Sequence, residues 1–188
     1  MSQSPLPPTP RVVVGVGDSP GCLTVLGRAA DEARLRGAEL WSVVAWEPPE
    51  GDLSARRFSA TAAMVPEWER LARERLVGAL RDVFGSADTG LPGRALIVRG
   101  APGPALVRLA AQDGDTLVIG AGVRGRLHRA LWPSVSRYCL AHATCPVLAV
   151  PPSPLQAALT AAHRRNTLRL RLDTGHLERD FDSVPPDA

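Results

Sequence analysis

Short aliphatic runs alternate with stretches of helical periodicity between residues 11 and 150. The first run, Arg11 to Val16, is rich in β-branched residues without polar–apolar alternation, which is typical of a central parallel strand buried on both faces. We predict five strands, at residues 11–16, 38–46, 94–98, 115–120 and 146–150. Strands that alternate with helices form parallel βαβ units with right-handed crossovers, so the pattern predicts an α/β fold.

The segments between these strands predict helices. In the first helix we expect Ser19 to be the cap and Pro20 the first helical residue, a favoured pairing, and Gly37 to end the helix. The apolar positions with helical spacing in this segment are Leu23, Leu26, Ala30 and Ala33.

A second helix is expected to start at Pro66 and end near Gly85. The residues expected to face inward from it are Leu71, Leu76, Leu80 and Val83. A third helix passes through Leu106 and Leu109. The fourth runs from Ser134 to His142, and the Ser134 side chain is expected to accept from first-turn amides.

The two ends of the chain differ from this regular middle. We expect residues 1–10 to form a disordered N-terminal arm and residues 151–188 a partly ordered C-terminal extension. The first ten residues have no apolar core of a secretory signal, and no apolar run approaches the ~18 residues of a membrane span. A cytoplasmic protein is therefore the expectation, with no membrane partner.

The number of cysteines and the distribution of charge limit the chemistry that the chain can perform. Cys22, Cys139 and Cys145 are odd in number and have no zinc-type spacing, so we expect reduced, mostly buried thiols and no metal site. All 22 basic residues are arginine, which excludes lysine-based chemistry. Residues 116–172 carry 8 arginines and no acidic residue, so positive charge collects there. This segment lacks interleaved aromatic residues, and we expect no nucleic-acid partner.

One stretch combines several signals. The apolar run Leu117 to Ile119 is closed by Gly120, and a loop with Arg124, Arg126 and Arg129 leads to the predicted helix start at Ser134. A strand, a glycine-bearing loop and a helix start form an anion site in α/β proteins, because backbone N–H groups and the helix dipole converge there.

At these residues the chain resembles the universal stress protein family. The nucleotide loop of that family reads glycine, two residues, glycine, nine residues, glycine and then serine or threonine. Counted from Gly120, the length fits, but the second and third glycine positions hold Val123 and Pro133. The residues that match the usual text of the family are Gly120, Arg124, Gly125, Ser134, Val135 and Ser136.

The resemblance covers residues 11–150 and implies a flavodoxin-like (adenine nucleotide alpha hydrolase-like) fold. That fold is a five-stranded parallel sheet in the order 3-2-1-4-5 with helices on both faces. The ligand would lie where the strand order reverses, between the first and fourth strands. The residues implied to line this site are Val16, Gly17, Asp18, Gly120, Gly122, Val123, Arg124, Gly125, Pro133, Ser134, Val135 and Ser136.

Three departures from the family pattern weaken the expected nucleotide site. Pro133 has no N–H, Val123 adds a β-branched side chain, and Asp18 stands one place later than the family aspartate that faces adenine. We therefore expect a non-catalytic regulatory or binding module with a degenerate adenine-nucleotide site that binds ATP weakly or not at all.

An alternative is a serine esterase. Gly17 to Gly21 fits G-x-S-x-G and resembles the nucleophile block of the GDSL hydrolases, with Ser19 as nucleophile and Asp173 and His176 as acid and base. That family also needs an asparagine in a G-x-N-D block, and Asn166 is the only asparagine in the chain.

The resemblance also implies partners. Members of the family commonly form dimers through their last strands, so we expect a homodimer through Pro146 to Val150, a short apolar strand that would otherwise leave an open edge. An unidentified protein client and an adenine nucleotide are the other partners that the resemblance implies.

Overall fold

The computed structural model describes residues 9–17, 19, 21–48, 62–121 and 134–153. By contacts the chain divides into two units, Met1–Pro152 and Ser153–Ala188, and every element described below belongs to the first. The elements are β1 (Arg11–Gly15), α1 (Cys22–Arg36), β2 (Glu39–Trp46), α4 (Val65–Phe84), β3 (Gly93–Arg99), α5 (Pro102–Leu109), β4 (Thr116–Gly120), α7 (Val135–His142) and β5 (Val147–Val150).

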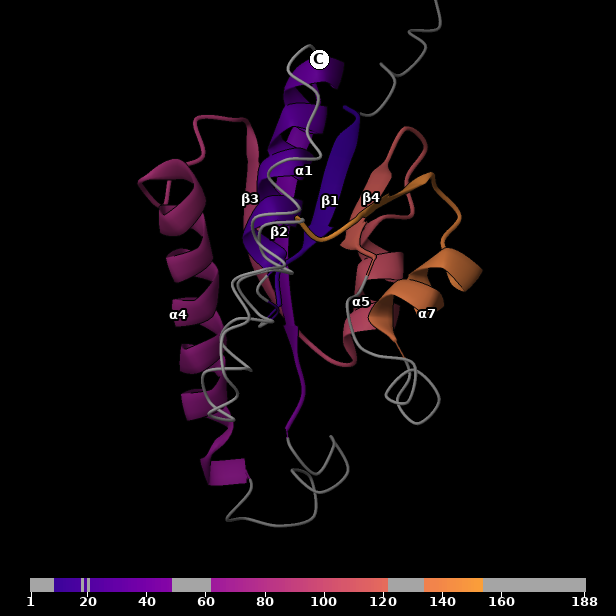
Figure 1. Ribbon diagram of the computed structural model, residues 1–188. Helices are drawn as coiled ribbons and strands as arrows, with labels where there is room; N and C mark the ends of the chain where they lie inside the picture. Colours follow the sequence, from indigo (N-terminus) through magenta and orange to yellow (C-terminus); the bar gives the residue numbers. More distant parts are fainter. Residues whose placement is uncertain (1–8, 18, 20, 49–61, 122–133, 154–188) are drawn as a thin grey trace, which may run out of the picture. The chain divides into compact units, whose positions relative to one another are not determined.

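The five strands form one parallel sheet in the order β3-β2-β1-β4-β5. Figure 1 shows α4 on one side of this sheet and α5 and α7 on the other. The predicted fold class and strand order are therefore confirmed, with strand bounds that differ by one residue at several ends.

Two apolar clusters hold the layers together. Val12 and Val14 of β1 pack with residues of α1 and α4, whereas Val13 packs with Leu106 of α5 and Cys139 of α7. All three valines are fully buried, because alternate side chains of β1 enter opposite layers. The absence of alternation in this run is thus explained by burial on both faces, as predicted.

The start of α1 corrects one prediction. The N-cap residue is Gly21, and the helix begins at Cys22 rather than at Pro20. Ser19 contributes its backbone carbonyl, which accepts from the N–H of Cys22 at 2.9 Å. The expected capping role of Ser19 was wrong, because the turn needs two more residues before the backbone becomes helical. Gly37 ends the helix in the left-handed conformation, as predicted.

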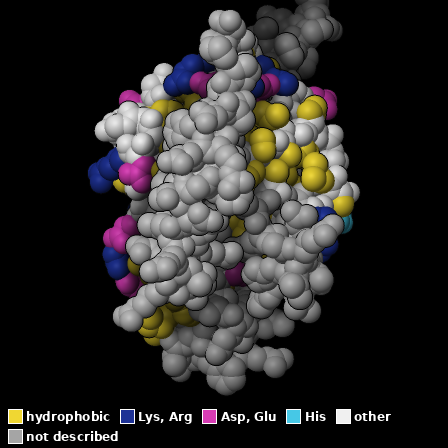
Figure 2. All heavy atoms as spheres, in the orientation of Figure 1, with side chains coloured by type: hydrophobic (Ala, Val, Ile, Leu, Met, Phe, Trp, Pro, Cys, Tyr) yellow, Lys and Arg dark blue, Asp and Glu magenta, His cyan; other side chains and the backbone are white. Residues whose placement is uncertain are grey.

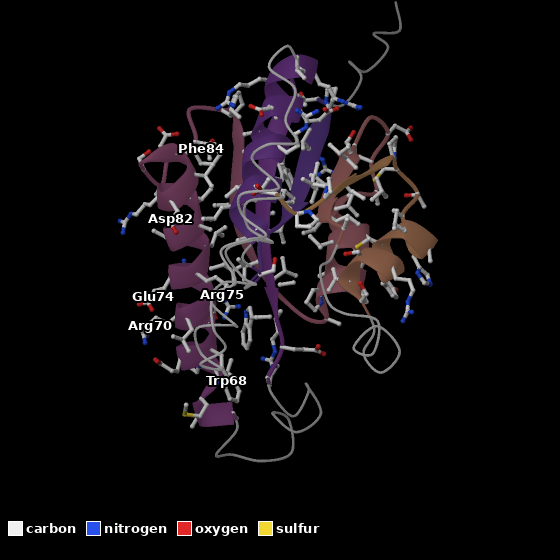
Figure 3. The ribbon with its side chains drawn as sticks, in the orientation of Figure 1. Trp68, Arg70, Glu74, Arg75, Asp82 and Phe84 are labelled. Atoms are coloured by element: carbon white, nitrogen blue, oxygen red, sulfur yellow. The ribbon has the colours of Figure 1, made fainter. Side chains whose placement is uncertain are left out.

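In α4 one of the predicted inward residues was wrong. Leu76 and Leu80 are buried as predicted, but Leu71 is 44% exposed and its neighbour Ala72 is buried instead. Ala72, Leu76 and Leu80 recur every four residues and share one face of the helix, whereas Leu71 lies roughly 180° around the helix from Leu80. Figure 3 shows Arg70 and Glu74, which form an ion pair, on the side of α4 that faces away from the sheet.

Two further features bear on function. None of the three cysteines forms a disulfide, and Cys22 and Cys139 are buried while Cys145 is half-buried, as predicted. None of the helices within the described ranges is both long and apolar enough for a membrane crossing.

Candidate functional site

The carboxyl end of the sheet has a notch above β1. The β1–β2 register ends with Gly15 beside Val43, and β2 continues to Trp46. The β1–β4 register ends with Val14 beside Val118, and β4 continues to Gly120. Both neighbours therefore extend beyond the end of β1, at the position where the strand order reverses and where ligands of such sheets bind.

The β2 wall of the notch is formed by the backbone at Ala45. The carbonyl of Val43 accepts from the N–H of Val16 at 2.8 Å, so Val43 faces β1. Alternate peptides of a strand point to the same side, and the carbonyl of Ala45 therefore faces the notch, where β1 has ended. Sequence reasoning missed Ala45. The available signal was the greater predicted length of the second strand compared with the first.

The β4 wall is joined directly to the start of α7. The hydroxyl of Ser136 donates to the carbonyl of Gly120 at 2.5 Å, and the N–H of Ala121 donates to the carbonyl of Val150 at 2.8 Å. A Cβ at Gly120 would lie 3.4 Å from Val25 of α1, so a larger residue here would press on that helix. These contacts fix the amino end of α7 beside the notch.

Ser134 is the N-cap residue of α7, with the extended backbone expected of a cap. Its side chain makes no capping hydrogen bond, which corrects the predicted role of its hydroxyl. The first turn of α7 also contains no acidic residue. The positive end of this helix dipole is therefore not offset by an acidic side chain in that turn.

The turn between β1 and α1 is anchored by sulfur. The N–H of Gly17 points at Sγ of Cys22, 3.3 Å away, and is directed into the protein rather than toward a ligand. Gly17 is exposed, and no other atom lies within 4 Å of where its Cβ would be. Gly17 can therefore border the site as exposed backbone, but its N–H already bonds Cys22.

Six of the twelve predicted site residues are described, and they come together from three segments. Val16 and Gly17 follow β1, Gly120 ends β4, and Ser134, Val135 and Ser136 open α7. Val16 is 4% exposed, so it supports the floor of the notch, and Val135 lies on the surface. The other six lie outside the described residues: Asp18, Gly122, Val123, Arg124, Gly125 and Pro133.

Catalytic and metal chemistry find no support in the described part of the chain. No group of three or more His, Cys, Asp or Glu residues with metal-ligand geometry occurs there. Burial raises the pKa of the Cys139 and Cys145 thiols, which disfavours the nucleophilic thiolate. Ser19 is exposed in the turn before α1, whereas Asp173 and His176, its partners in the esterase alternative, lie outside the described residues.

A surface depression of about 380 Å³ lies at the opposite end of the sheet, lined by residues that include Arg34, Glu39 and Leu91. The carboxyl end of α1 and the start of β2 form much of its wall. It therefore contributes nothing to the notch above β1.

Two solved structures with TM-scores above 0.5 support the fold. Universal stress protein UspA from Lactobacillus plantarum is 18% identical, with a TM-score of 0.57 over 75% of this chain and 97% of that chain. A hypothetical protein described as a test case of structural genomics is 17% identical, with a TM-score of 0.60 over 77% and 96%. A universal stress protein in complex with cAMP is 28% identical, with a TM-score of 0.48 over 77% and 98%.

A search of curated proteins finds no match. Residues 9–151, however, match the universal stress protein family, which covers every strand and helix described above. No comparison points to a GDSL hydrolase. The chain belongs to the universal stress protein family.

Proposed function

We propose that this protein is a non-catalytic binding module of the stress response that receives an adenine nucleotide in the notch above β1. The observation that carries the proposal is the notch itself, formed because β2 and β4 both outrun β1. Its walls differ in chemistry. One is a backbone edge at Ala45, beyond the end of the β1–β2 pairing, and the other is the start of α7, which the hydroxyl of Ser136 joins to Gly120. A purine base can hydrogen-bond to a backbone edge, and a phosphate can bind at the start of a helix.

The base would be held by the edge of β2. Adenine presents an amino donor beside ring-nitrogen acceptors, and the carbonyl of Ala45 is an acceptor for that amino group. The overhanging strand is rigid, because Trp46 continues to pair with Arg99 of β3. A rigid edge holds the base without loss of side-chain entropy.

The phosphates would lie at the amino end of α7. Uncapped first-turn amides and the helix dipole favour an anion there. The hydroxyl of Ser134 is a further donor beside them. Arg124, Arg126 and Arg129, in the loop outside the described residues, supply the positive charge.

The affinity of this site for ATP is low. Pro133 lacks an N–H donor to a charged oxygen, a loss of roughly 1.5–3 kcal/mol. Val123 at a position that favours glycine costs of order 1–3 kcal/mol if its φ is positive. Because Gly17 also turns its amide toward Cys22, the turn after β1 does not replace the missing donor. The losses add to about 3–6 kcal/mol, or two to four decades of affinity.

The assembly would be a homodimer through β5. A cytoplasmic setting suits three cysteines that form no disulfide, and an unidentified protein client would be a further partner. The N–H groups of Leu117 and Ala121 bond the carbonyls of Pro146 and Val150, so the even-numbered β5 peptides face β4. Val147 and Ala149 therefore face the open edge. Figure 2 shows hydrophobic side chains gathered over this strand, at the upper right.

Heat release from the purified protein tests the nucleotide proposal. The supernatant is expected to carry little or no adenine absorbance and no ATP mass. One ATP released per chain would contradict a degenerate site.

A further inference from the structure

The outer edge of β3 is a second binding surface. β3 pairs with β2 over seven positions, from Gly93 beside Leu40 to Arg99 beside Trp46. Within the described residues it has no strand on its other side. Every residue of β3 is exposed or half-buried, whereas the first four residues of β1 are buried. Figure 1 places β3 toward the α4 side of the view, at the opposite edge from β5.

The hydrogen bonds of β2 show which β3 peptides face outward. The N–H of Leu40 donates to Pro92, and the N–H of Gly100 donates to Trp46, both at 2.8 Å. The even-numbered peptides of β3 therefore face β2, and the peptides of Ala95, Ile97 and Arg99 face the open edge. These groups can form a ladder with an added strand, as sheets do when they bind extended peptides.

Two arginines stand at the ends of this edge. The guanidinium of Arg94 lies 5.2 Å from the Trp41 ring centroid on the α5 face, and that of Arg99 lies 5.7 Å from Trp46 on the α1/α4 face. Both arginines are exposed. Stacking on an indole restricts a guanidinium, and its five N–H donors allow it to bond more than one acceptor.

Between the arginines the edge is apolar. The segment Ala95 to Val98 reads Ala-Leu-Ile-Val, and β3 contains no acidic residue. A complementary strand would have small or β-branched residues in the middle and a carboxylate at each end. Residues directly opposite one another share a face of the sheet, so the two carboxylates must stand five positions apart, about 17 Å.

A second copy of the chain would bring no carboxylate to this edge. In an antiparallel pairing of two β3 strands, directly opposite residues lie on the same face of the sheet. Arg94 of one copy would then stand beside an even-numbered residue of the other, such as Val98, and β3 contains no acidic residue for either arginine. The charge of this edge therefore favours an acidic segment of another protein.

We propose that β3 binds an extended acidic segment of a partner protein, which adds as a sixth strand with carboxylates five positions apart beside Arg94 and Arg99. This surface lies two strands from β1 and is separate from the nucleotide notch. The proposal does not depend on nucleotide binding.

Fluorescence anisotropy with two labelled peptides tests the charge requirement. One peptide is Ser-Glu-Val-Thr-Ile-Thr-Glu-Ser, and the control replaces both glutamates by lysine. We expect the acidic peptide to bind the wild-type protein at least about tenfold more tightly, and Arg94→Glu with Arg99→Glu to reverse the preference. No binding of the acidic peptide, or the same preference after charge reversal, would overturn the proposal.

Proline substitution tests the backbone ladder. Ala95→Pro removes an outward N–H and keeps the bonds to β2, whereas Ala95→Val retains that N–H. We expect Ala95→Pro to weaken acidic-peptide binding about tenfold or more and Ala95→Val to leave it unchanged, with circular dichroism showing both variants folded. Equal binding by the two variants would exclude strand addition. Self-association that Ala95→Pro abolishes would assign the edge to a second copy and contradict the proposal.

Discussion

Arg11 and Asp115, 104 positions apart, form a bidentate ion pair where β1 and β4 begin. Nε and Nη2 of Arg11 lie 2.9 and 2.5 Å from the two carboxylate oxygens, and the side chains are 8% and 0% exposed. The guanidinium also bonds the carbonyl of Leu109 and stacks 4.3 Å from the Trp41 ring. The hydrogen bond to Asp115 raises the pKa of Arg11. The pair joins β1 and β4 at their amino ends, opposite the ends that form the floor and one wall of the notch.

Arg11→Met should destabilise the protein by about 3–5 kcal/mol, because it leaves the Asp115 carboxylate buried without a cation. Urea unfolding measures the loss. The double variant Arg11→Met, Asp115→Leu should recover a large part of it, since an apolar pair of similar volume replaces the ion pair. A loss below about 1 kcal/mol for the single variant would show that water reaches the pair.

For Ser42 we expect the opposite effect of substitution on stability. Its side chain is buried in β2 at 2% exposure, and its hydroxyl has no hydrogen-bond partner in the described part of the chain. Ser42→Ala should leave stability unchanged or raise it by up to about 1 kcal/mol in urea unfolding. Thr116→Val is the matched control, because the equally buried Thr116 hydroxyl accepts from Arg36 at 2.8 Å. The control should lose about 0.5–1.5 kcal/mol, and a larger loss for Ser42→Ala than for Thr116→Val would contradict this account.

The sequence pattern predicted the strands of the sheet and their order because few environments suit such patterns. A β-branched run such as Val12–Val14 suits one environment, a strand covered on both faces, and Gly37 and Gly85 meet the left-handed backbone at two helix ends. The inward face of α4 was predicted less well. Ala72 has the four-residue spacing to Leu76 and Leu80, and the choice of Leu71 as an inward residue did not follow that periodicity.

The candidate site was predictable only in part. The loop spacing located Gly120 and Ser134 to Ser136, since those positions are local in sequence. Ala45 contributes through its backbone and depends on where β1 stops, which no side chain signals. The sulfur contact between Gly17 and Cys22 likewise depends on the path of a turn, and the turn was placed wrongly when Ser19 was taken as the cap.

Alkaline pH should destabilise the protein through its buried thiols. Burial raises the pKa of Cys139 and Cys145 in the folded state, while unfolded cysteine ionises near pH 8.5. Above about pH 8.5 the unfolded chain releases protons that the folded chain keeps, so stability falls as pH rises. The chain has no lysine, which leaves few other groups to titrate there. Urea midpoints between pH 7 and 10 should fall in the wild type and fall less in Cys139→Ala, Cys145→Ala. Identical slopes would contradict the prediction.

Pairing through the open edge of β5 predicts a dimer in solution. Ala149 is exposed and its N–H faces outward, so Ala149→Pro should remove a ladder donor without disturbing the bonds to β4. Light scattering at micromolar concentration should show a dimer for the wild type and for Ala149→Val, and a monomer for Ala149→Pro. A monomeric wild type, or a dimer that survives the proline, would rule out pairing through β5.

Calorimetric titration of ATP into the wild type and into Val123→Gly, Pro133→Gly tests the degenerate notch most directly. GTP serves as the control ligand, because guanine carries an oxygen where adenine has the amino group that would donate to Ala45. The account predicts weak or undetectable ATP binding by the wild type and a gain of about two to four decades in the double variant, which should bind ATP more tightly than GTP. Tight ATP binding by the wild type, or a double variant with no gain, would contradict it.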